Sequence, residues 1–234
     1  DYNVQKTINR VQSTSHIADL VSEARTLGFE SVNLDLIYGL PNQSEETFAS
    51  TIAATKAMMP DRISLFSYAH LPERFAAQRK FAPGTLPSSE EKAALYNLAV
   101  NGFKRVGYEM IGLDHFALRS DSLAIAKHKG KLHRNFQGYT LRGDTDLIGV
   151  GVSAISTIGN AFTQNAKDLK EYYKRIDRQL PSAKVGLSLT PDDLVRRDVI
   201  SSLMCNLSVD KQSISSKHHI IFDEYFSEAL SNLE

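Results

Sequence analysis

Hydrophobic and polar positions recur with two periods over the first half of the chain, and these periods predict helices and strands in turn. Several predicted helices and strands have residues at their ends that mark where they begin or stop. Ser44 begins a helix in the capping-box run SEET, Pro60 ends that helix, and Gly107 precedes a strand. The predicted elements are helix 13–29, strand 32–38, helix 44–59, strand 62–68, helix 87–106 and strand 108–113. Short connections between the first two strands predict a parallel pair with a right-handed crossover.

The second half of the chain has a different pattern. A short helix is predicted at 120–130, and a polar, turn-rich segment and the apolar small-residue run 147–159 follow it. The chain from Ala166 onward is predicted to be mostly helical. The predicted helices there are 168–180, 191–207 and 222–233. This order predicts an α/β fold, either half of a (β/α) barrel or part of a doubly wound sheet, followed by a mostly helical portion.

Composition narrows the class of protein. The 234 residues are 42% hydrophobic and 23% charged, as in ordinary globular proteins. The 27 basic and 27 acidic residues cancel, which argues against a nucleic-acid partner or an anionic membrane surface. No apolar run predicts a membrane span, and the polar start DYNVQKTINR is not a signal peptide. The single cysteine, Cys205, lies in an apolar helical run, so we expect a buried thiol, no internal disulfide and a cytoplasmic setting.

Polar side chains near strand ends are the first sign of a ligand site. Asp35 lies in the strand SVNLDLIYGLP, whose exit carries Tyr38 and the turn Gly39-Leu40-Pro41. Ligands bind at the carboxyl ends of strands in parallel α/β barrels, so we favour ligand contact over a structural role for Asp35. We expect the strand around Asp35 to be buried. The next strand ends in small Ala69 and His70, and both ligand contact and a satisfied polar role stay open for His70.

Two further motifs have a plainer interpretation. Asp114 and His115 follow the third predicted strand, and because neighbours on a strand point to opposite faces we expect only weak pairing between them. The run Gly149–Ala154 matches the GxGxxA dinucleotide fingerprint, but it does not open a βαβ unit. Close packing of these small residues against a cofactor or a neighbouring strand is the better interpretation.

The segment 133–139, HRNFQGY, concentrates donors, acceptors and aromatic rings in seven residues. Arg134 is suited to clamp a carboxylate, and Phe136 or Tyr139 is suited to stack on an aromatic ligand. We favour a ligand site over a plain loop here, although this stretch alone does not identify the ligand.

Four segments together resemble the oxygen-independent coproporphyrinogen III oxidase (dehydrogenase) family of haem biosynthesis, which consists of radical S-adenosylmethionine enzymes. They are VNLDLIYGLPNQ, FSYAHLP, IGLDHFA and LHRNFQGYTLRGDTDLIGVGVSAIS, and the resemblance extends along nearly the whole chain. It implies the second half of an incomplete (β/α)6 radical-SAM barrel over residues 1–116. It also implies an active-site closing segment over 117–160 and the start of a helical C-terminal domain over 161–234.

The resemblance implies oxidative decarboxylation of two propionates of coproporphyrinogen III to vinyl groups, which gives protoporphyrinogen IX. The family uses two S-adenosylmethionine molecules and a [4Fe–4S] cluster, with electrons from a reductase or flavodoxin-type donor, in a full-length protein expected to be a monomer. By position, Arg10, Asp35 and Ala69 match contacts to one S-adenosylmethionine, and Ile155 matches a contact to the other.

The same resemblance assigns the active-site segment. Phe136 and Gln137 match family positions near the methionine-derived ligands and the porphyrinogen, and Arg134 lies in the same segment.

One family motif does not occur in the sequence. The cluster needs a C-x-x-x-C-x-x-C loop because three thiolates hold three of its irons, so the resemblance places the cluster ligands outside this chain. We therefore expect a fragment that lacks the N-terminal cysteine-motif region, has no metal site of its own and is inactive alone. Two alternatives stay open: a cluster-less haem- or porphyrin-binding module of the same superfamily, and a different (β/α) enzyme that binds a nucleotide.

Overall fold

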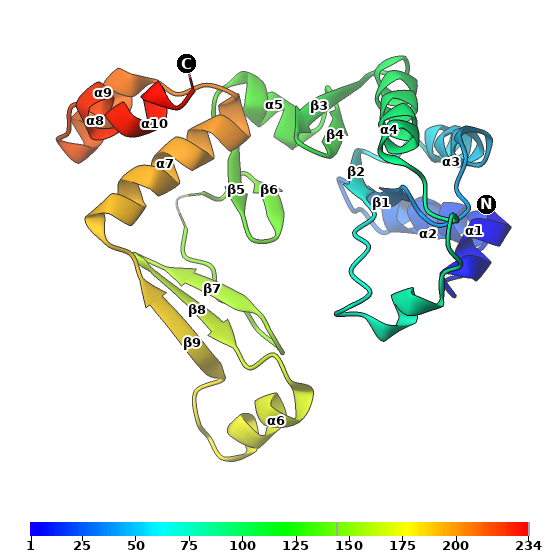
Figure 1. The fold of residues 1–234 in the computed structure, drawn as a ribbon, viewed down its shortest axis with the longest axis horizontal. Coiled ribbons are helices and arrows are strands. Elements are labelled where there is room, and N and C mark those ends of the chain that lie inside the picture. The colour runs from blue at the N-terminus through cyan, green and yellow to red at the C-terminus, as the bar shows by residue number, and fades with distance from the viewer. Residues whose placement is uncertain (144, 234) are drawn as a thin grey trace. The chain divides into compact units, whose positions relative to one another are not determined.

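The computed structural model describes residues 1–143 and 145–233, and the chain divides into two compact units, Asp1–His128 and Lys129–Glu234 (Figure 1). The division falls inside the predicted closing segment, 117–160. The predicted boundaries at 116 and 160 concern the family's barrel and helical domain, and they stay predictions.

Helices and strands alternate through the first unit, and serine side chains fix where its main helices begin. The elements are α1 (Tyr2–Thr7), α2 (Thr14–Thr26), β1 (Asn33–Tyr38), α3 (Glu45–Met58), β2 (Arg62–Ser67), the 3-10 helix η1 (Ala76–Lys80), α4 (Ser89–Lys104), β3 (Tyr108–Gly112), β4 (His115–Leu118) and α5 (Ser122–His128). Ser44 and Ser88 each form a capping box, in which the side chain accepts a hydrogen bond from the third residue of the helix. These caps confirm the predicted starts of α3 and α4.

The sheet of the first unit is only partly parallel. β1 and β2 pair in parallel, with Leu36 opposite Leu65, as predicted. The order is β1-β2-β4-β3, and β4 runs antiparallel to both of its neighbours. Strand β4 was not predicted, although Gly112 and Asp114 flank the turn at Leu113, which adopts φ +46 without being a glycine.

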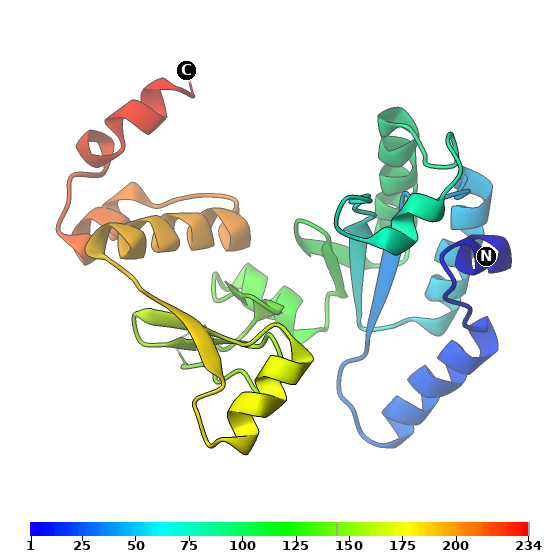
Figure 2. The same ribbon diagram turned by 60° about the horizontal axis from the view of Figure 1, so that its bottom comes forward.

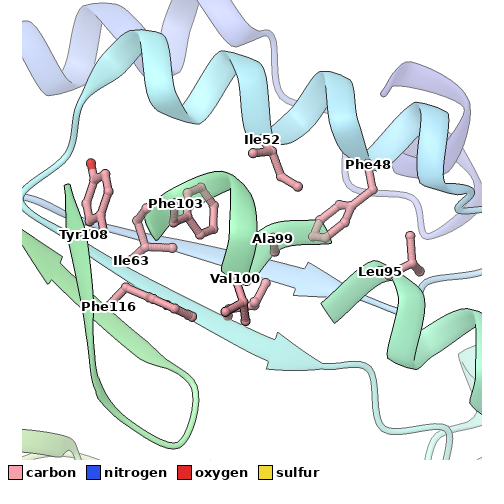
Figure 3. Close-up of a cluster of buried hydrophobic side chains, with 10 residues drawn as sticks. Phe48, Ile52, Ile63, Leu95, Ala99, Val100, Phe103, Tyr108 and Phe116 are labelled. Atoms are coloured by element: carbon pink, nitrogen blue, oxygen red, sulfur yellow. The ribbon is translucent and has the colours of Figure 1, made fainter. Parts of the chain in front are cut away.

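The hydrophobic core lies between one face of this sheet and helices α3 and α4 (Figure 3). Strand side chains alternate between faces, so every second residue of β1, β2 and β4 points into it. The buried cluster comprises Phe48, Ile52, Ile63, Leu65, Leu95, Ala99, Val100, Phe103, Tyr108 and Phe116. The core therefore leaves the opposite face of the sheet available for polar residues.

The second unit contains more strand than the sequence pattern predicted. Its elements are β5 (His133–Asn135), β6 (Gly138–Thr140), β7 (Ile155–Ile158), β8 (Ala161–Asn165), α6 (Leu169–Asp177), β9 (Ala183–Ser188), α7 (Pro191–Asn206), α8 (Lys211–His218), α9 (Phe222–Tyr225) and α10 (Ser227–Ser231). β5 and β6 form a hairpin, and β7, β8 and β9 form an antiparallel sheet (Figure 2).

Two expectations for the second unit were wrong in part. β9 interrupts the predicted helical run, because its alternation of Ala183, Val185 and Leu187 with polar or small residues suits a strand rather than a helix. The predicted helix 222–233 is two short helices that meet at Phe226. Helices α6 and α7 were predicted, and the Pro191 and Thr190 start of α7 follows the usual N-terminal pattern.

Candidate functional site

A row of polar side chains crosses the face of the first unit's sheet that lies opposite the core. Asp35 of β1 lies opposite Ser64 of β2, and Ser64 lies opposite His115 of β4. Directly opposed residues of neighbouring strands point to the same face, so these three side chains share the face that the core does not use. Side chains from three strands therefore meet on one surface.

Hydrogen bonds orient the Asp35 carboxylate in this row. Asn33 donates from Nδ2 to Asp35 Oδ1 at 2.7 Å, and Ser64 donates from Oγ to Asn33 Oδ1 at 3.2 Å. The expectation of a buried strand was wrong for this residue: Asp35 is exposed and sits in the middle of β1. The reason is the alternation of side chains along β1: Asn33 and Asp35 lie on the face opposite the core, whereas Leu36 packs against the core.

Gln43 holds the turn where β1 ends, a role that the sequence analysis missed. Its Oε1 accepts hydrogen bonds from the backbone N–H of Gly39 at 2.6 Å and of Leu40 at 3.3 Å, and its Nε2 donates to Ile37 O at 3.2 Å. Gly39 has φ +82, which favours glycine. Gln43 directly follows the turn residues Pro41 and Asn42, and a polar side chain at that position was the available signal that it could hold the turn.

The β2 exit places small Ala69 beside an aromatic cluster. Ala69 is exposed, and its carbonyl accepts a hydrogen bond from Gln78 Nε2 at 3.2 Å. The His70 ring lies 6.3 Å from the Tyr68 ring and 6.1 Å from the Phe81 ring, and burial raises the pKa of Tyr68. Among the described residues, the buried Nδ1 of His70 has no hydrogen-bond partner. A buried polar atom of this kind calls for a water molecule or a ligand.

Asp114 and His115 pair closely, contrary to the prediction. His115 Nδ1 and Asp114 Oδ1 are 2.7 Å apart, and the Phe66 ring meets the imidazole edge-on at 6.0 Å. The alternation rule did not apply because Asp114 lies in the turn before β4 rather than on the strand. The turn lets its carboxylate reach the imidazole of the next residue.

Arg10 lies in the loop after α1, where its side chain is exposed and its backbone N–H donates to Gln5 O at 2.9 Å. No hydrogen bond or ion pair within the described part of the chain joins the Arg10 guanidinium to Asp35. The structure thus places Asp35 on β1 and Ala69 just after the end of the neighbouring strand β2, but it does not link Arg10 to them.

In the second unit, the β5–β6 hairpin presents the predicted active-site segment. Phe136 and Gln137 form its two-residue tip, and the Gln137 N–H donates to Asn135 Oδ1 at 2.8 Å. Phe136 is 61% exposed. Tyr139 is buried instead, and its hydroxyl donates to Met204 O at 3.0 Å, so Phe136 is the better candidate for stacking on a ligand.

Arg134 is held over the ring of Tyr139, with its Cζ 4.9 Å from the ring centre. Its Nη1 is a buried donor without a hydrogen-bond partner within residues 1–143 and 145–233. A guanidinium with an unfilled donor is suited to take a carboxylate oxygen. This geometry fits the predicted carboxylate clamp.

The hairpin tip meets the three-stranded sheet. The Phe136 and Phe162 rings lie edge-to-face, 5.3 Å apart. Phe162 of β8 lies opposite Thr157 of β7, two residues from Ile155, so Ile155 and Phe162 point to the same face. The structure therefore brings Phe136 and Ile155, two residues predicted from the resemblance, to one face of this sheet.

The small-residue run before β7 serves packing, as predicted. A Cβ on Gly149 would lie 2.6 Å from Ile155 O, so a larger residue cannot pack against β7 there. Asn165 donates from Nδ2 to the carbonyls of Gly149 and Gly151 at 3.2 and 2.8 Å. The run is a clamped loop that precedes a strand and not the first turn of a βαβ unit.

Cys205 is buried in α7, as predicted, and burial raises the pKa of its thiol. Over the described ranges, no group of three or more His, Cys, Asp and Glu side chains is arranged to hold a metal ion. Within the same ranges, none of the helices has the length and apolar character needed to cross a membrane.

Comparison with known proteins finds close relatives, although no family model matches the chain. Oxygen-independent coproporphyrinogen III oxidases from Escherichia coli K12 and Pseudomonas aeruginosa are 48% and 44% identical over the whole chain, which spans about half of their length. The solved structure of coproporphyrinogen III oxidase (HemN) from Escherichia coli, described as a radical SAM enzyme, matches 99% of this chain and 53% of its own with a TM-score of 0.96. The oxidase of Thermostichus vulcanus is 41% identical, and the chain covers 72% of it. The chain therefore belongs to the oxygen-independent coproporphyrinogen III oxidase family.

Proposed function

We propose that the complete product of the reading frame containing residues 1–234 converts two propionates of coproporphyrinogen III to vinyl groups in an S-adenosylmethionine-dependent reaction. The observation that supports this most strongly is the match to HemN, at 48% identity and a TM-score of 0.96 over nearly the whole chain. Residues 1–234 would supply part of the cofactor site and part of the substrate site of that protein, which we expect to be a cytoplasmic monomer.

The exposed Asp35 end of the polar row in the first unit suits S-adenosylmethionine. The Asp35 carboxylate, oriented by Asn33, would accept hydrogen bonds from ribose hydroxyls or from the ammonium group. Exposed Ala69 leaves room for a flat ring at the end of the neighbouring strand. Arg10 would add a cation to this site, and Ile155 would contact a second S-adenosylmethionine. When bound and reduced, S-adenosylmethionine supplies the hydrogen abstraction that the protein side chains cannot perform.

The residues of this chain do not fit an iron–sulfur cluster. Three thiolates are needed, whereas Cys205 is the only cysteine in the sequence and is buried. We place the [4Fe–4S] ligands outside residues 1–234, where a reductase or flavodoxin-type donor would deliver electrons. The 234-residue chain alone should therefore be inactive.

The hairpin of the second unit suits the substrate. Arg134 offers a buried donor to a propionate carboxylate, and Phe136 and Gln137 sit at an exposed tip. Their role would be to bind and orient the tetrapyrrole and to exclude water from the reacting side chain.

An anaerobic turnover assay tests this function. The complete gene product, reconstituted with iron and sulfide, is incubated with S-adenosylmethionine, a reductant and coproporphyrinogen III, and protoporphyrin is quantified after oxidation. We expect vinyl product from the complete protein and none from residues 1–234. A cluster-loaded protein that binds S-adenosylmethionine but forms no vinyl product would overturn the proposal. Tightly bound tetrapyrrole without a cluster or turnover would favour the porphyrin-binding module instead.

A further inference from the structure

One face of the β7–β8–β9 sheet carries six side chains, and none of them is charged. Opposed pairs in the strand register define it: Ile155 faces Gln164 and Thr157 faces Phe162 across β7 and β8. The same β8 residues face Val185 and Leu187 of β9. We call this surface the uncharged sheet face, and its members are Ile155, Thr157, Phe162, Gln164, Val185 and Leu187.

Large apolar side chains of this face lie open. Val185 and Leu187 are each 60% exposed, and Phe136, which abuts Phe162, is 61% exposed. Exposed apolar side chains that lie side by side mark a surface for binding rather than for solvent. The neighbouring Lys184, at the register shift of β9, is engaged in an ion pair with Glu171 at 2.7 Å.

The size of the face favours a multi-ring ligand. Strands are spaced by about 4.8 Å, and alternate residues along a strand by about 7 Å, so three strands give a surface about 10 Å wide. This exceeds what one nucleoside base would cover. The face also provides no cation, so a ligand with carboxylates would lay its rings on the face and extend its acidic groups beyond the edges.

We propose that the uncharged sheet face binds the ring system of the tetrapyrrole substrate, and that Phe162, Val185 and Leu187 are substrate-binding residues. This inference rests on the proposed function, which supplies a tetrapyrrole with carboxylate side chains as the substrate. Two features support it. Phe136, a predicted residue of the substrate segment, borders this face because its ring meets Phe162 edge-to-face. Ile155, the predicted S-adenosylmethionine contact, lies on β7 at one edge of the same face, so rings bound over Phe162, Val185 and Leu187 would lie beside that cofactor.

A binding titration tests the inference, with coproporphyrin III as a stable fluorescent probe and the complete gene product as the protein. Leu187→Glu places a carboxylate under the apolar rings and should weaken binding at least tenfold, and Val185→Glu should do the same. Ser188→Glu is the matched control, because it introduces the same charge on the opposite face of the same exposed strand and should change the affinity less than twofold. Unchanged thermal melting would show that the variants fold.

The outcomes separate this inference from the proposed function. Binding that Leu187→Glu and Val185→Glu weaken and Ser188→Glu spares supports the inference. Equal binding by all three variants overturns it and leaves the proposed function standing, with the tetrapyrrole held elsewhere. If the unsubstituted protein does not bind the probe but still forms vinyl product from coproporphyrinogen III, the inference fails and the proposed function stands. If S-adenosylmethionine displaces the probe completely, the face holds a nucleoside and the inference fails alone.

Discussion

Asn33 donates a hydrogen bond to Asp35 across one strand repeat, from Nδ2 to Oδ1 at 2.7 Å, on the face of β1 that points away from the hydrophobic core. Because the carboxylate is exposed, it contributes little to the stability of the fold. Its fixed orientation instead suits it to bind a ligand. This separation of stability from binding leads to the first prediction.

Asp35→Asn should weaken S-adenosylmethionine binding by the complete protein about tenfold or more, because a hydrogen bond to a charged group contributes roughly 1.5–3 kcal/mol. The free energy of unfolding should change by less than about 0.5 kcal/mol, as for most exposed substitutions. Calorimetric titration measures the affinity. Asp19→Asn, on an exposed position of α2, is the control and should bind as the parent does. Equal affinity in Asp35→Asn would remove Asp35 from the site.

Phe103 is fully buried and packs on the rings of Tyr108 and Phe116, 5.9 and 5.7 Å away. Phe103→Ala should lower the free energy of unfolding of the first unit by about 3–5 kcal/mol, because it leaves a cavity in the core. Urea denaturation measures this loss. Phe29→Ala removes the same ring from a 64% exposed position and should cost less than about 0.5 kcal/mol. Similar losses in both variants would mean that this core does not control stability.

Gly149→Ala should destabilise the second unit by about 1–3 kcal/mol, because the added methyl would meet the Ile155 carbonyl oxygen at 2.6 Å. The penalty is steric, since Gly149 does not have a positive φ. Gly186→Ala in the same sheet finds its nearest neighbour at 3.7 Å and should be neutral, or stabilising by up to about 1 kcal/mol. Thermal denaturation gives the melting temperature of each variant. Equal melting temperatures for Gly149→Ala and Gly186→Ala would contradict the predicted steric penalty at Gly149.

The helices of the second unit should lose stability in acid through Asp198. Burial alone would raise the pKa of this carboxyl, but hydrogen bonds from Lys217 and His218, at 2.6 and 2.7 Å, outweigh burial and hold the pKa below its ordinary value. A carboxyl with a lowered folded-state pKa stabilises the fold above its unfolded-state pKa, near 4, and this stability is lost as the pH falls further. Asp198→Asn should flatten the dependence of melting temperature on pH below about 4. If the melting temperature of Asp198→Asn fell with pH as steeply as that of the parent protein, Asp198 would not contribute to the loss of stability in acid.

Local signals in the sequence were enough to predict much of the first unit. Ser44 and Ser88 announce their helices because a capping box is made within four residues, and the parallel pairing of β1 and β2 follows from the single helix between them. Strand β4 could not be predicted in the same way. Its hairpin turns at a left-handed Leu113, and the flanking Gly112 and Asp114 mark a turn without showing that the chain returns as an antiparallel strand.

The candidate site shows the same limit. The motif segments identified Asp35, Arg134 and Phe136, and the alternation of Asn33 and Asp35 with leucines was a signal for the polar face of β1, but the pairing of Asp35 with Ser64 of β2 was not predicted. The meeting of Phe136 with Phe162 depends on the register between separate strands. Contacts between residues distant in sequence therefore had to come from the structure.

The most direct test of the central claim is label transfer from the substrate. Coproporphyrinogen III deuterated at the β-carbons of its propionates is given to the cluster-reconstituted complete protein under anaerobic conditions. The predicted result is vinyl product together with deuterium in 5′-deoxyadenosine, both strongly reduced in Asp35→Asn. Vinyl product without label in 5′-deoxyadenosine, or no vinyl product from a protein loaded with cluster and S-adenosylmethionine, would contradict it.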